Sequence, residues 1–100
     1  MAASQLQVTN NPARSRWEAH VDGFTAFADY TLNGRVVTFP HTVVPPQLEG
    51  RGIGSQLARA ALDDARSRDL SVVPSCPFFR GFIERHREYE DLVDPAFRRA

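Results

Sequence analysis

The chain has 100 residues, 42% of them hydrophobic, and its 12 basic and 12 acidic side chains cancel. This size fits one compact domain with one core, and the balanced charge gives no indication of general nucleic-acid binding. No apolar run approaches the roughly 20 residues that span a bilayer, and the N-terminus lacks the regions of a signal peptide. We therefore expect one cytoplasmic domain over residues 1–100, a monomer or weak dimer with no nucleic-acid or membrane partner.

Cysteine and histidine usage argues against cross-links and metal chemistry. Cys76 is the single cysteine, so an internal disulfide is excluded. The three histidines lie far apart and show none of the short spacings that metal ligands adopt. We expect no metal in this protein.

Alternating apolar and polar residues predict an antiparallel meander in the first half of the chain. Over residues 16–21 every second position is apolar, the pattern of a strand buried on one face. The alternation resumes over residues 24–32, and a third strand begins at residue 36. Asp22-Gly23 and Asn33-Gly34 are hairpin signals between these strands.

The middle of the chain predicts a bent strand, a helix and a crossover. Pro40 lacks an amide for the ladder, so we expect a bulge or an edge there, a bend near His41 and a strand end at Pro45-Pro46. Apolar residues at helical spacing over residues 53–65 predict an amphipathic helix. The apolar run over residues 70–73 suits a strand parallel to the one before that helix.

A second helix is expected to begin at Pro77, because proline is well tolerated at the first helical position. Cys76 then becomes the N-cap residue. Asp94-Pro95 breaks the remaining segment, and Phe97 is placed to pack back on the core. The fold class is α/β: an antiparallel meander followed by a long helix, a parallel strand and a second helix.

Three alternate glycines, Gly50, Gly52 and Gly54, stand between the third strand and the long helix. Without Cβ atoms, backbone amides can converge on a phosphate, and a helix start favours negative charge. An ordinary tight turn is the other interpretation. A P-loop requires a lysine, which this chain lacks, and a Rossmann turn has different glycine spacing.

The segment over residues 43–57 resembles the acetyl-CoA motif of the GNAT superfamily of N-acetyltransferases, commonly Arg/Gln-x-x-Gly-x-Gly/Ala at the start of a long helix. Gly52 and Gly54 occupy the two glycine positions, whereas Glu49 stands where Arg or Gln is usual. We expect the Glu49 side chain to point away from a bound pyrophosphate, with Arg51 offsetting its charge.

More narrowly, His41-Thr42, the glycine turn, Pro74-x-Cys76-Pro77-Phe78 and Arg87-Glu88-Tyr89 are similar to the small YjdJ-type branch of that superfamily. The resemblance covers residues 16–93, and members of this branch consist of little beyond the coenzyme-binding core. It implies acetyl-CoA as co-substrate and a primary amine of unknown identity as acceptor.

The resemblance also assigns the coenzyme contacts. Pantetheine would follow the third strand, the glycine turn would take the pyrophosphate, and an arginine on the second helix would reach the phosphates. The expected binding residues are Thr42, Val43, Val44, Gly50, Arg51, Gly52, Ile53, Gly54, Ser55 and Arg80.

Two side chains are candidates for the chemistry of acetyl transfer. His41 can accept a proton from the acceptor amine, or it can be a histidine that holds the strand bulge. Cys76, at a helix start, can be an acyl-accepting nucleophile, activated by His41 if the two side chains meet, or a small buried residue. Direct transfer and an acetyl-cysteine route both stay open.

Two further functions fit the same sequence. A non-catalytic acyl-CoA sensor would keep the glycine turn without a competent base. A protein-interaction domain would use its glycines only for close packing and would have no affinity for the coenzyme.

Overall fold

The computed structural model describes residues 7–97, in which short strands precede the first α-helix and a further strand lies between it and the second. The strands are β1 (Val8–Asn11), β2 (Arg16–Val21), β3 (Phe24–Asp29), β4 (Thr31–Asn33), β5 (Val36–Thr38), β6 (Thr42–Val43) and β7 (Ser71–Val73). The α-helices are α1 (Ile53–Ser67) and α2 (Pro77–Arg85), and the 3-10 helices are η1 (Pro12–Arg14), η2 (Pro46–Leu48) and η3 (Arg87–Leu92).

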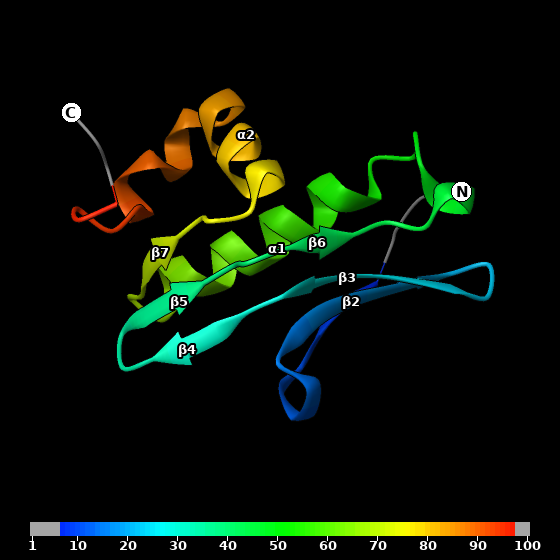
Figure 1. The fold of residues 1–100 in the computed structure, drawn as a ribbon, viewed down its shortest axis with the longest axis horizontal. Helices are drawn as coiled ribbons and strands as arrows, with labels where there is room; N and C mark the ends of the chain where they lie inside the picture. The colour runs from blue at the N-terminus through cyan, green and yellow to red at the C-terminus, as the bar shows by residue number, and fades with distance from the viewer. Residues whose placement is uncertain (1–6, 98–100) are drawn as a thin grey trace.

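In the described part of the chain, the strands form two small sheets (Figure 1). The first sheet has the order β1-β2-β3-β6 and is antiparallel throughout. In the second sheet, of order β4-β5-β7, β5 and β7 run parallel and are connected through α1. The predicted meander, crossover and second helix are confirmed, and with them the α/β fold class.

The strand expected over residues 24–32 is instead two strands, one in each sheet, and that prediction was wrong in extent. The break falls at Tyr30, whose amide donates to the carbonyl of Ser15 at 2.9 Å. Thr31 then pairs with Thr38 in the second sheet. Because β4 is an edge strand, Leu32 is 46% exposed rather than buried as its place in the alternation indicated.

The interruption expected at Pro40 is confirmed, and it carries the chain from one sheet to the other. Before it, the amide of Phe39 donates to the carbonyl of Val73 at 3.0 Å; after it, the carbonyl of His41 accepts from the amide of Asp29 at 3.0 Å. Phe39 and Thr42 both face the helices, although they are three residues apart in an extended segment. One extra residue at Pro40-His41 therefore shifts the alternation of faces, as a bulge does.

The sequence reasoning missed β1. Its residues after Val8 are Thr9, Asn10 and Asn11, which show no apolar alternation. β1 forms because its backbone pairs antiparallel with β2 over residues 16–19. Pairing with a neighbouring strand, rather than local pattern, decided this element.

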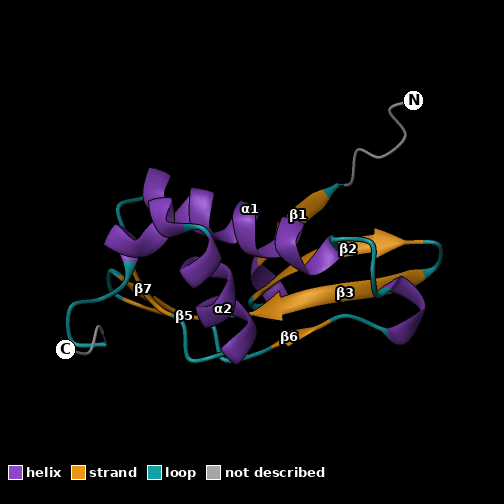
Figure 2. Ribbon diagram, turned by 90° about the horizontal axis from the view of Figure 1, so that it is seen from above, coloured by secondary structure: helices purple, strands orange, loops and turns teal. Residues whose placement is uncertain are grey.

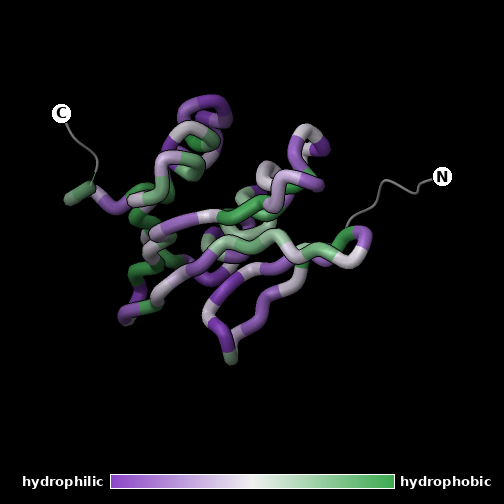
Figure 3. Tube along the Cα trace, turned by 45° about the vertical axis from the view of Figure 1, so that its right-hand side comes forward, coloured by the Kyte–Doolittle hydropathy of each residue, from purple (hydrophilic) through white to green (hydrophobic). Residues whose placement is uncertain are grey.

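The hydrophobic core lies between α1, α2 and the strands (Figures 2 and 3). The inner face of α1 is buried as its spacing predicted: Ile53, Leu57, Ala58, Ala61, Leu62 and Ala65. Phe79 of α2 stacks on Phe39 with ring centroids 4.3 Å apart, a contact that contributes about 0.5–1.5 kcal/mol beyond burial. Phe97 packs against the same core, as expected. These contacts hold the start of α2 beside the bend between β5 and β6.

Candidate functional site

A cavity of about 440 Å³ opens between β6, η2 and the first turn of α1. Seven of the ten expected coenzyme contacts line it, and the others in the lining are Leu48, Glu49 and Phe78. The seven are Thr42, Val44, Gly50, Gly52, Ile53, Gly54 and Ser55. β6 lies at an edge of the first sheet, so its outer backbone edge is open to an extended ligand.

The start of α1 leaves backbone amides for a ligand. Gly52 is the N-cap residue in the left-handed conformation, with φ 73°, and within the described chain no side chain caps it. The first helical bond runs from the amide of Gln56 to the carbonyl of Gly52 at 3.1 Å. The amides of Ile53, Gly54 and Ser55 precede that bond and have no acceptor within the helix. Helix geometry thus supplies donors beside the cavity, where the helix dipole favours an anion.

Gly50 and Gly54 are glycines for different reasons. Gly50 has φ 83°, a backbone conformation that side chains disfavour, and a Cβ there would meet open space. Gly54 is helical, but a Cβ there would lie 2.9 Å from Cζ of Phe78. Close packing therefore explains Gly54, whereas turn conformation explains Gly50 and Gly52.

Sequence reasoning assigned Leu48 and Phe78 no part in the site. Leu48 is 1% exposed at the end of η2, and Phe78 lies in the first turn of α2 and is half-buried. Proline at the first position of each short helix was the available signal, because it fixes where the following side chains lie.

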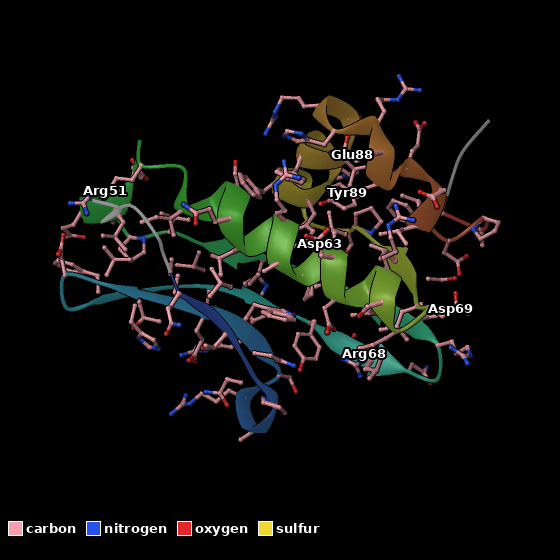
Figure 4. The ribbon with its side chains drawn as sticks, turned by 180° about the vertical axis from the view of Figure 1, so that it is seen from behind. Arg51, Asp63, Arg68, Asp69, Glu88 and Tyr89 are labelled. Carbon is pink, nitrogen blue, oxygen red and sulfur yellow. The ribbon has the colours of Figure 1, made fainter. Side chains whose placement is uncertain are left out.

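The two expected arginines lie outside the cavity lining. Arg51 forms an ion pair with Asp22 of the β2–β3 turn, with Nη1 2.9 Å from Oδ2, at one end of the molecule (Figure 4). Arg80 is exposed on the first turn of α2. Glu49 is exposed and belongs to the lining, so the displacement of its carboxylate from a bound pyrophosphate stays a prediction. Val43 is 40% exposed on β6.

His41 and Cys76 have different partners on opposite faces of β6 and its sheet. Cys76 is buried, and its thiol lies 3.6 Å from Oγ1 of Thr42 on the side of the helices. His41 precedes Thr42, so its side chain points to the other face, where Nε2 lies 2.6 Å from Oδ2 of Asp29. The structure therefore does not bring His41 and Cys76 together as a nucleophile and its base.

The outer face of the first sheet also carries a buried carboxylate. Glu18 is 6% exposed and accepts hydrogen bonds from Arg16 at 2.7 Å and Asn11 at 3.1 Å. The hydrogen bond from Arg16 is the largest cause that lowers the pKa of Glu18 below its ordinary value; burial opposes it, and Asn11 and His20 make smaller contributions that lower the pKa further. Glu18 lies among these partners, away from the cavity lining.

Residues 7–97 hold neither a metal-binding cluster nor a helix that could span a membrane. No group of three His, Cys, Asp or Glu side chains gathers there to hold a metal ion. Neither α-helix in that range has both the length and the apolar character needed to cross a bilayer.

The antiparallel meander, the crossover helix and the glycine turn at its start define a small GNAT-type domain. A family model described as GCN5-related N-acetyl-transferase matches residues 16–92. The chain belongs to the GCN5-related N-acetyltransferase family. Membership of the YjdJ-type branch stays a prediction.

The chain is also similar to curated proteins and to a solved structure. Protein NATD1 from Gallus gallus is 36% identical over 84 residues, covering 81% of this chain and 76% of that protein. Protein NATD1 from Bos taurus is 38% identical over 63 residues, 61% of this chain, and the match spans a little over half of that protein, 56%. The solution NMR structure of a "GCN5-like putative N-acetyltransferase" from Staphylococcus aureus shares the fold, with a TM-score of 0.69 at 23% identity over 94% of this chain and 91% of that chain.

Proposed function

We propose that this chain transfers an acetyl group from acetyl-CoA to a primary amine. The observation that carries the proposal is the cavity beside the start of α1, which combines an uncapped helix start with an open strand edge. These two features match the two parts of coenzyme A: a charged diphosphate and an extended amide-bearing arm.

The diphosphate belongs at the glycine turn. The amides of residues 53–55 have no helical acceptors, and the positive end of the helix dipole lies at the same point. Arg51, which follows Gly50, can supply positive charge once it leaves Asp22, and Arg80 on the first turn of α2 is the second candidate. The Glu49 carboxylate opposes binding unless it turns outward.

The pantetheine arm belongs along residues 42–44. β6 pairs with β3 on one side only, so an extended chain can add to its other side by backbone hydrogen bonds. Thr42 and Val44 line the cavity, and Val43 points out of it. In this proposal the thioester lies at the outer backbone edge of β6 beside Thr42, where groups from both faces of the sheet can reach it.

The transfer needs a neutral amine and a stabilised leaving thiolate. In our proposal His41 accepts a proton from the ammonium group, directly or through water, and the amine attacks the thioester carbon. The carbon–sulfur bond then breaks, and the coenzyme thiolate takes up the second proton, which the nitrogen loses as it becomes an amide. Because His41 and Cys76 lie on opposite faces, His41 serves the amine rather than the Cys76 thiol.

A backbone NMR titration tests the binding half of the proposal. Coenzyme A should shift the amide signals of residues 50–55, whereas S-acetyl-pantetheine, which lacks the diphosphate, should leave those signals nearly unchanged. Unmoved signals at millimolar coenzyme A would remove the proposal. The protein-interaction function would then remain. That function explains the turn glycines by close packing, but close packing accounts only for Gly54 among them.

Amine-dependent release of coenzyme thiol tests the catalytic half. His41→Ala should slow release over an amine panel, and an acetyl-Cys76 adduct in the mass spectrum would reveal a two-step route. Full turnover in Cys76→Ala without an adduct would indicate direct transfer. Coenzyme binding with no release for any amine would assign the chain to the non-catalytic sensor function.

A further inference from the structure

Asp29 and His41 form a close pair on the sheet face away from α1. The carboxylate Oδ2 of Asp29 lies 2.6 Å from Nε2 of His41, and the backbone amide of Asp29 donates to the His41 carbonyl at 3.0 Å. The neighbouring Ala28 is fully buried against the helices, so Asp29 must project to the opposite face. Two contacts, one of backbone and one of side chain, therefore fix the pair in place.

The chemistry of the pair determines where the imidazole proton lies. A bare imidazole nitrogen and a carboxylate oxygen would repel each other through their lone pairs at 2.6 Å, so Nε2 of His41 carries a proton where it meets Asp29. When the ring is neutral, Nδ1 is then the nitrogen with a free lone pair. The His41 side chain is 61% exposed, so an amine or a water molecule can reach that atom.

We propose that Asp29 is a positioning residue for acetyl transfer: it holds His41 with Nε2 protonated and Nδ1 ready to accept the proton of the acceptor ammonium. This inference rests on the proposed function, which assigns the base but no partner to it. The ammonium N–H bond breaks, its electron pair stays on nitrogen, and the proton binds Nδ1. The resulting imidazolium has the Asp29 carboxylate as counter-charge, and it later releases the proton to solvent.

His20 on the same sheet face shows what distinguishes His41. Nδ1 of His20 lies 2.9 Å from the hydroxyl of Thr25, and its Nε2 lies 3.2 Å from Oε1 of Glu18. Both ring nitrogens of His20 are engaged, whereas for His41 the described residues provide one partner, at Nε2. His20 is thus a matched control: a carboxylate-paired histidine without a free nitrogen.

The first test reads the imidazole directly and needs no turnover. In nitrogen NMR of the neutral ring, His41 should show a protonated Nε2 and a bare Nδ1. In Asp29→Asn the amide can donate to Nε2, so the Nδ1-protonated form should gain population. A proton on Nδ1 in the wild type, or identical His41 signals in both proteins, would overturn the proposal.

The second test asks whether Asp29 acts through His41. Asp29→Asn should lower kcat by about tenfold or more, since general base catalysis contributes roughly 10²–10⁴-fold, with the KM for acetyl-CoA unchanged. In a His41→Ala background the same change should have no further effect, and Asp29→Glu should restore part of kcat. His20→Ala should keep the wild-type rate. An equal loss from Asp29→Asn with and without His41 would contradict the proposal.

The proposed acetyl transfer and the proposed role of Asp29 would fail with different experimental results. If the wild type binds acetyl-CoA but acetylates no amine, the catalytic function fails. The NMR measurement alone then decides whether Asp29 holds the imidazole. If transfer occurs and the double-variant cycle shows no coupling, the function stands and the role of Asp29 is rejected.

Discussion

Gly54 lies directly under the ring of Phe78, so that the Cβ which glycine lacks would be 2.9 Å from Cζ and 3.3 Å from Cε1. Gly54 belongs to the first turn of α1 and Phe78 to the first turn of α2. The missing side chain lets the two helix starts meet beside the cavity that both residues line. Gly54, one of the three alternate glycines of the turn, therefore also allows α1 and α2 to pack closely.

Gly54→Ala should destabilise the protein although alanine is the better helix former. The added methyl group forces the ring of Phe78 to move, and overpacking of this kind costs roughly 1–3 kcal/mol. Chemical denaturation with two probes measures the loss. The double variant with Phe78→Leu should recover part of it, because the smaller side chain yields space.

Gly81→Ala is the matched control for that substitution. Gly81 also lies inside a helix, but its added Cβ would make only an ordinary 3.4 Å contact with the end of the Arg85 side chain. Alanine should therefore stabilise the protein by up to about 1 kcal/mol through helix propensity. Equal losses at both glycines would contradict a specific role of the Phe78 contact.

Gly52→Ala should cost stability for a different reason, its left-handed backbone at φ 73°. Placing a residue with a Cβ there costs roughly 1–2 kcal/mol. Gly52→Asn should cost less, since asparagine tolerates that conformation better. Thermal unfolding of both variants would check this order, and the same loss in both would refute the conformational explanation.

Glu18 should make the protein sensitive to acid. The hydrogen bond from Arg16 holds the pKa of Glu18 below its ordinary value of 4.5, so the folded state favours the ionised carboxylate. The resulting stability is present above pH 4.5 and is lost as pH falls through the lowered pKa. Urea unfolding at a series of pH values measures the effect. Glu18→Gln should be less stable near neutrality and should show a flatter decline in acid.

Tyr89 should give the opposite dependence, in alkali. Its hydroxyl donates to Oδ1 of Asp63 at 2.6 Å and accepts from Arg59 at 3.2 Å, which joins η3 to α1 (Figure 4). Burial, and then the bond to Asp63, raises the pKa of Tyr89 above 10.0. The stability from its neutral form is complete below pH 10.0 and is lost as pH rises through the raised pKa.

Tyr89→Phe tests this contact. Loss of the hydroxyl should lower stability by about 1.5–3 kcal/mol at neutral pH, since hydrogen bonds to charged partners are removed. Above pH 10 the variant should decline less steeply than the wild type in denaturant titrations. A parallel decline in both proteins would assign the alkaline loss to another group.

The reliability of the sequence-based predictions followed how local each cause was. The helix over residues 53–65, the Pro77 helix start and the hairpin at Asp22-Gly23 all depend on neighbouring residues, and all three are confirmed. The prediction of one strand over residues 24–32 was wrong because the amide of Tyr30 donates a hydrogen bond to the carbonyl of Ser15, which is distant in sequence. β1 was missed because its partner strand, rather than its own pattern, orders it.

By itself the sequence determined the α/β order of elements and the glycine turn before the long helix, because periodicity, proline and glycine act over a few positions. Only the tertiary structure decided that Pro40-His41 shifts the strand by one residue. That shift places His41 with Asp29 on one face and Thr42 with Cys76 on the other. Side-chain direction alternates along a strand, so a single inserted residue redistributes the candidate site over two faces.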